Sequence, residues 1–84
     1  MQEESRTEMK ILAVLQQENL ILVSGKMVSG DVYGERYLSC LETGGKWEVN
    51  AKAFSNFENG VRLIGLEHVE GSNDLKIDFT LISA

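Results

Sequence analysis

Short apolar segments separated by turn residues follow one another from residue 20 to the end of the chain. Strict alternation of apolar and polar residues is clearest in two of them, 47–53 (WEVNAKA) and 75–81 (LKIDFTL). A period of two places successive side chains on opposite faces of an extended chain. Each segment is therefore predicted to be a β-strand with one buried face and one face in water.

Three further strands are predicted at 20–28, 32–41 and 61–69, with glycine-containing turns between the segments. The strand at 20–28 carries apolar residues on both alternating faces, which is typical of a strand covered on two sides. The dipeptide Asn59-Gly60 favours a tight reversal before the strand at 61–69, because both residues tolerate positive φ.

The N-terminal segment is predicted to be a helix from Ser5 to Glu18. Ser5 and Glu8 have the spacing of a capping box, in which the two side chains satisfy the first free N–H groups of a helix. Good helix formers follow, and Asn19 can adopt the left-handed conformation that ends a helix. The alternative is a hairpin of KILAVL and LILVSG joined by QQEN. The helix is favoured because that turn contains neither Gly nor Asp.

These elements predict an α+β domain, with an N-terminal helix packed on a curved antiparallel sheet of about five strands. The whole chain, 1–84, is expected to form one small domain in which residues 1–4 are disordered. The alternation patterns predict a core that consists of Leu12, Leu15, Leu22, Trp47, Val49, Leu63, Ile77 and Phe79.

Composition narrows the classes of function. The net charge of −5 and the scattered Lys and Arg residues argue against nucleic acid as a partner, since phosphate binding needs a basic stripe. No apolar stretch approaches the length of a membrane helix, and the acidic N-terminus is unlike a secretory or mitochondrial signal. The expectation is a cytoplasmic protein that binds neither nucleic acid nor membrane.

Candidate chemistry is sparse. His68 is the only histidine, and the sequence places no nucleophile beside it. Cys40 is the only cysteine, so an internal disulfide is excluded, and its apolar neighbours indicate a core position. We therefore predict no catalytic residue, no cofactor and no metal site, and expect that the protein is not an enzyme.

Tyr33, Arg36 and Tyr37 form the one cluster of residue types that are favoured in interface hot spots. They suggest a small acidic module that acts through protein–protein contacts, as an inhibitor or an assembly subunit. A homodimer is expected, face to face or through edge strands, with Tyr33 and Tyr37 at or near the contact. The reason is that one helix covers only one side of a sheet whose strand at 20–28 is apolar on both faces.

A small-ligand-binding domain is the alternative function. Its pocket is expected between the helix and the sheet, lined by Leu12, Trp47 and Phe79. An enzyme comes third, because it would need a nucleophile and an orienting group near His68.

Two partial resemblances accompany these patterns. GKMVSGDV and the later VEGSN resemble the two motifs of Sm-like RNA-binding proteins. The uridine-binding residues of that family have no match around Tyr37 to Cys40, and Glu70 stands where the family has a basic residue, so this function is not carried over. The hydrophobic pattern is also similar to small periplasmic domains of pilus and type II secretion assembly proteins, but it lacks their second long helix. We adopt neither family.

Overall fold

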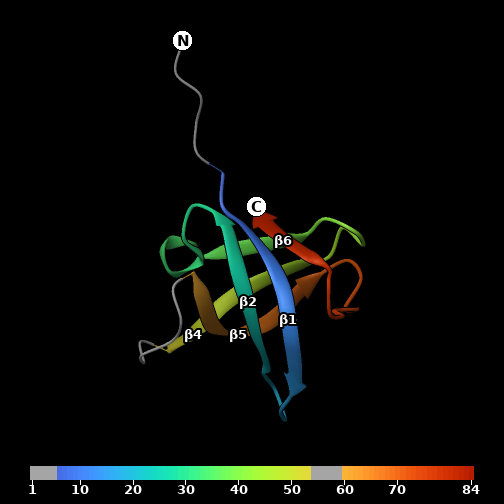
Figure 1. The fold of residues 1–84 in the computed structure, drawn as a ribbon. Helices are drawn as coiled ribbons and strands as arrows, with labels where there is room; N and C mark the ends of the chain where they lie inside the picture. Colours follow the sequence, from blue (N-terminus) through green and yellow to red (C-terminus); the bar gives the residue numbers. More distant parts are fainter. Residues whose placement is uncertain (1–5, 54–59) are drawn as a thin grey trace.

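The computed structural model describes residues 6–53 and 60–84 and is a closed, six-stranded antiparallel β-barrel (Figure 1). The strands neighbour one another in the order β1-β2-β5-β4-β3-β6, and β6 pairs with β1 to close the barrel. The elements are β1 (Glu8–Gln16), β2 (Ile21–Ser29), the 3-10 helix η1 (Val32–Gly34), β3 (Tyr37–Cys40), β4 (Lys46–Ala53), β5 (Val61–Glu70) and β6 (Thr80–Ser83).

The predicted N-terminal helix is wrong, and with it the α+β class: the described residues form an all-β domain without an α-helix. Residues 8–16 form strand β1, which pairs with β2 as the hairpin that was the alternative prediction. The backbone N–H of Gln17 donates to the carbonyl oxygen of Leu20, 2.8 Å away, and this bond closes the turn. Ser5 of the capping box lies outside the described residues.

A β-bulge explains why the strand was missed. The register of β1 against β2 shifts between Ile11 and Ala13, so that the period of two changes phase within the strand. Met9 and Ile11 before the shift are fully buried, and Val14 after it packs against the same core. The resulting near-continuous apolar block is a pattern that a buried helix also has. Differences in intrinsic helix propensity between ordinary residues are well under about 1 kcal/mol per residue. Pairing with the neighbouring strands therefore decides the structure of this segment.

Two predicted strands are shorter than expected. The segment 32–41 begins as η1, which Asp31 caps by accepting a hydrogen bond from the N–H of Tyr33 at 3.0 Å, and only Tyr37–Cys40 pair as β3. The segment 75–81 is mostly loop, because Asp78 has a φ of 77° and interrupts the extended chain before β6.

The tight turn predicted at Asn59-Gly60 is described only at Gly60, whose φ is 81°.

The core fills the interior of the barrel. Its buried members are Met9, Ile11, Val23, Val32, Leu38, Cys40, Trp47, Val49, Ile64, Leu66 and Leu81. Of the predicted core, Trp47 and Val49 are confirmed, as is the buried position of Cys40. Predictions for eight residues thus succeeded for only two. Leu12, Leu15 and Ile77 are exposed, and Leu22, Leu63 and Phe79 are half-buried.

Closure of the barrel covers one of the two apolar faces of β2, which was expected to need cover from a helix or from another chain. Val23 of β2 is fully buried opposite Ile64 of β5, so the barrel interior covers this face of the strand. The opposite face carries Leu22, which pairs with Gly65 on the outside and remains half-buried. The residues that the structure describes include no helix long and apolar enough to cross a membrane.

Candidate functional site

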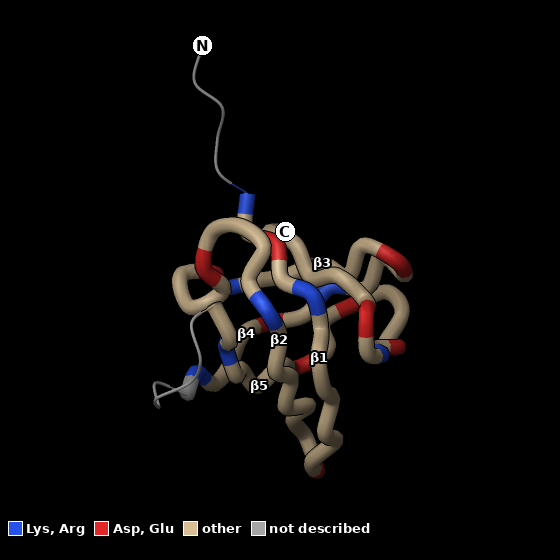
Figure 2. The backbone as a smooth tube through the Cα atoms, viewed as in Figure 1, with Lys and Arg blue, Asp and Glu red and all other residues tan. Residues whose placement is uncertain are grey.

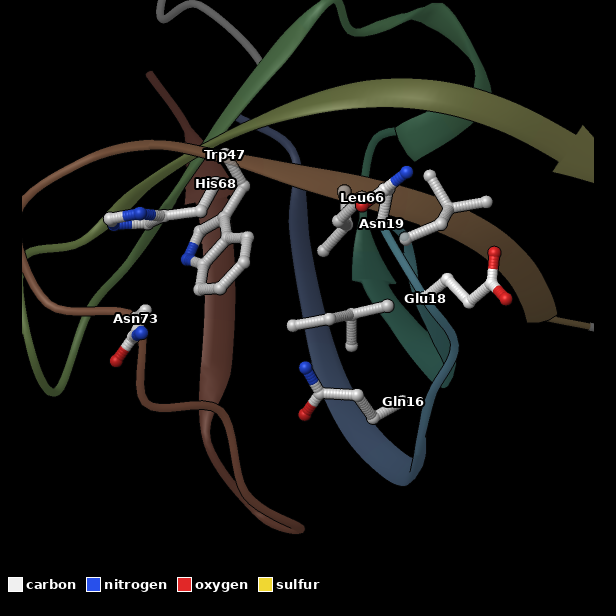
Figure 3. A pocket seen from close by; sticks show the side chains of 9 residues that line it. Gln16, Glu18, Asn19, Trp47, Leu66, His68 and Asn73 are labelled. Carbon is white, nitrogen blue, oxygen red and sulfur yellow. The ribbon is translucent and has the colours of Figure 1, made fainter.

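A cleft of about 320 Å³ opens at the end of the barrel where the β1–β2 turn, the start of β4 and the end of β5 come together (Figure 3). The loop that follows β5 forms one side of it. Its lining consists of Gln16, Glu18, Asn19, Leu20, Ile21, Trp47, Leu66, His68 and Asn73. The volume lies at the lower end of the range for small-molecule sites, about 300–1,000 Å³.

The apolar wall of the cleft is set by strand register. Ile21 of β2 lies opposite Leu66 of β5, and Trp47 of β4 lies opposite His68 of β5. Trp47 and Leu66 are fully buried, because both side chains point into the barrel. This wall is therefore part of the core, and its position follows from the barrel rather than from a loop.

The indole N–H of Trp47 has no hydrogen-bond partner, and among the described residues no other side-chain nitrogen or oxygen is buried in that state. Figure 3 shows the indole nitrogen on the edge of the ring that faces His68 and Asn73. A buried donor without an acceptor costs about 1–3 kcal/mol, and such a group calls for an explanation. An acceptor for this donor would have to approach from the side of these two side chains.

His68 joins the wall of the cleft to its loop. Its ring centroid lies 4.9 Å from that of Trp47, with the planes tilted by 59°. Its Nε2 atom lies 2.9 Å from the carbonyl oxygen of Gly71. A carbonyl oxygen only accepts, so Nε2 carries the proton, and in the neutral ring Nδ1 holds the lone pair. His68 thus holds the loop that carries Asn73.

The rim of the cleft is polar and contains one charge. Gln16, Asn19 and Asn73 offer carboxamide groups, each with two donors and an acceptor, and Glu18 offers a carboxylate. None of the nine lining residues is Ser, Thr, Cys, Lys or Arg, so His68 has no nucleophile beside it in this lining. The described part of the chain also contains no group of three or more potential metal ligands. The arrangement is suited to binding polar groups.

The predicted interface residues lie in two separate groups. Tyr37 lies close to two cations, with Arg36 Cζ 5.4 Å and Lys46 Nζ 4.8 Å from its ring centroid. Tyr33 of η1 lies under Arg62, whose Cζ is 5.2 Å from the ring. The rings thus cover basic side chains, which is a structural use of tyrosine.

The predicted pocket residues are also separated. Trp47 lines the cleft, whereas Leu12 is exposed on β1 and Phe79 packs half-buried against the core. The sequence reasoning missed Gln16, Asn19 and Asn73, which lie at the end of β1 and in two different turns. The QQEN turn of the alternative hairpin was the available signal for the first two, but nothing local shows that the loop with Asn73 meets that turn.

Two neighbours of Asp31 favour the charged form of its carboxyl group. The hydrogen bond from the N–H of Tyr33 lowers the pKa of Asp31 from its ordinary value, and Arg62, 3.2 Å away, lowers this pKa further. A carboxyl group whose pKa is lower in the folded state stabilises the fold at pH values above its unfolded-state pKa. This stabilisation is lost as the pH falls through the folded-state pKa.

The variant Asp31→Asn should therefore lose less than about 1 kcal/mol at pH 7, because the Asp31 side chain is half exposed and asparagine still caps. The difference from the wild type should shrink below about pH 4. Urea unfolding at several pH values measures both effects. A difference that grows on acidification would contradict the assigned pKa direction.

Comparison of the chain with protein-family models, with curated proteins and with solved structures finds no match.

Proposed function

We propose that this barrel is a non-enzymatic binding domain that takes a small, neutral, polar molecule in the cleft. The observation that carries the proposal is the buried, unpartnered indole N–H of Trp47. A ligand oxygen that accepts from it would satisfy this donor in a setting with little competing water, where a hydrogen bond is strong. The apolar wall formed by Ile21 and Leu66 favours a ligand with one apolar side.

The charge of the site argues for a neutral ligand. Glu18 is the only carboxylate in the lining, no Lys or Arg accompanies it, and the whole chain has a net charge of −5. An anion would therefore be repelled and would find no cation to pair with. The three carboxamides of the rim can donate to and accept from hydroxyl or amide groups. A neutral sugar or amide of about monosaccharide size fits this chemistry.

The chain contains a single tryptophan, which makes the binding test direct. The ¹H–¹⁵N spectrum should show one indole N–H signal, and titration with N-acetylglucosamine should move it downfield and saturate. A gain of about 0.3 kcal/mol per non-hydrogen atom predicts a Kd of millimolar order for such a ligand. Glucuronate, a sugar with a carboxylate, should bind more weakly.

A pair of asparagine variants provides the control. Asn73→Ala removes a rim amide and should weaken binding several-fold, because a polar contact to the ligand is lost. Asn50→Ala should leave binding unchanged, since Asn50 lies outside the cleft and bonds to Glu67. If N-acetylglucosamine does not move the indole signal of the folded protein, the proposed function is refuted. Equal binding by the two asparagine variants would refute the site.

A further inference from the structure

Residues 71–74 follow β5 and form one side of the cleft, and we call them the gate loop (Figure 3). The imidazole of His68 donates to the carbonyl oxygen of Gly71, 2.9 Å away. In the part of the chain that the structure describes, this is the only hydrogen bond between the gate loop and the rest of the barrel. The bond from the N–H of Asp74 to the hydroxyl of Ser72 stays within the loop. One side chain therefore holds the gate loop in place.

The gate loop also crosses the loop between β3 and β4, and glycines lie on both sides of the crossing. A Cβ added to Gly45 would overlap the carbonyl oxygen of Ser72, and one added to Gly71 would lie 3.2 Å from the carbonyl oxygen of Gly44. The two backbones are thus in contact, but no backbone hydrogen bond joins these described segments. Contact of this kind is weak for each pair of atoms. The crossing can therefore separate without the loss of a hydrogen bond.

The unpartnered indole N–H of Trp47 lies next to this crossing. A Cβ added to Gly45 would lie 3.4 Å from Trp47 Nε1. The nitrogen is buried, and it faces His68 and Asn73 in Figure 3. His68 and the gate loop that carries Asn73 therefore form the side from which an acceptor would have to approach. Because the donor is buried, an acceptor reaches it only after part of this cover has moved.

The strands around the indole are held far more firmly than the gate loop. At Trp47, β4 is paired on both sides, with Leu38 of β3 and with His68 of β5. Movement of either neighbouring strand would break several backbone hydrogen bonds. Leu75, directly after the gate loop, packs against the core and limits the movement to residues 71–74. Opening of the gate loop breaks one hydrogen bond, so it is the movement that uncovers the indole N–H at the lowest free energy.

We propose that the gate loop opens when the bond between His68 and Gly71 is released, and that the acceptor of the ligand binds Trp47 in this open form. The second half of this inference rests on the proposed function, whereas the opening itself needs no ligand. His68 is thus a positioning residue, which acts through the gate loop. Loss of one hydrogen bond of ordinary strength changes the ratio of open to closed forms about threefold to tenfold. A ligand that binds only the open form shifts the ratio in the same direction.

Hydrogen exchange of the indole N–H, followed by NMR without ligand, measures the opening, because a buried N–H exchanges through local opening. His68→Phe keeps a ring beside Trp47 but removes the donor to Gly71, so the indole should exchange about threefold to tenfold faster. His68→Gln keeps an N–H donor and removes the ring, and it should restore the slow exchange. The backbone amides of β2 and β5 should exchange alike in all three proteins. Equal indole exchange in the two variants would overturn the proposal.

Titration of the same variants with N-acetylglucosamine separates this proposal from the proposed function. An open form that is populated more often raises the apparent affinity by the same factor, so His68→Phe should bind about threefold to tenfold more tightly than His68→Gln. If the sugar moves the indole signal but binds His68→Phe no more tightly, the gate loop does not control the site, and the proposed function stands. If the sugar moves no indole signal while the exchange rates differ as expected, the opening is supported and the proposed function is refuted.

Discussion

Replacement of Trp47 by alanine should lower the free energy of unfolding by about 3–5 kcal/mol. The side chain is the largest of those that are fully buried, and it forms part of both the core and the wall of the cleft. The loss combines the removal of apolar contacts with the cavity that remains. A small domain has a total stability near the lower end of about 5–15 kcal/mol, so much of this variant should be unfolded at 25 °C.

Urea unfolding followed by far-UV circular dichroism measures this loss, since the variant has no tryptophan fluorescence. Ile77→Ala is the control, because Ile77 is also apolar but is exposed in a loop, and it should change the stability by less than about 0.5 kcal/mol. A Trp47→Ala protein as stable as the control would mean that the indole is not buried in the core of the barrel.

The second large effect is expected for Gly45→Ala, at about 3 kcal/mol. Gly45 is buried where the loop between β3 and β4 crosses the loop after β5. An added Cβ would overlap the carbonyl oxygen of Ser72, a backbone atom that cannot move without its loop. The loop that carries Asn73 must then shift, so the substitution should alter the cleft as well as the stability.

Gly34→Ala is the matched control. Gly34 has no atom within 4 Å of an added Cβ and does not have a positive φ, so the change should be neutral or stabilising by up to about 1 kcal/mol. The same urea titration measures both variants. If Gly45→Ala proved as harmless as Gly34→Ala, the two loops would not be in contact.

The alternation in 47–53 predicted its strand correctly, but it predicted which side chains are buried only as far as the bulge between Val49 and Ala51. Trp47 and Val49 are buried as expected, and the register shift between Val49 and Ala51 then turns Ala51 outward. In 75–81 the same alternation was misleading. The φ of 77° at Asp78 places Phe79 against the core and leaves Ile77 in solvent. A bulge or a single left-handed residue costs little locally, so a pattern of side chains does not reveal it.

The candidate site was harder to predict than the strands. Trp47 was expected in a pocket between a helix and the sheet, whereas the cleft that it lines lies beside the β1–β2 turn and the loop after β5. Gln16, Asn19 and Asn73 are ordinary turn or strand-end residues in sequence, and they come together only because β2 pairs with β5 and β5 pairs with β4. That pairing brings the β1–β2 turn and the loop after β5 to the same end of the barrel.

Local chemistry alone was enough to predict that the chain reverses several times and that apolar residues such as Trp47, Val49 and Cys40 are buried. Glycine at positive φ and apolar alternation act over a few residues, so they can be read from neighbours in the chain. The state of residues 8–16, the closure by β6 and the cleft depend on hydrogen bonds between residues far apart in the chain. A strand has no backbone partner within itself, so its existence and its register are set by the strands beside it.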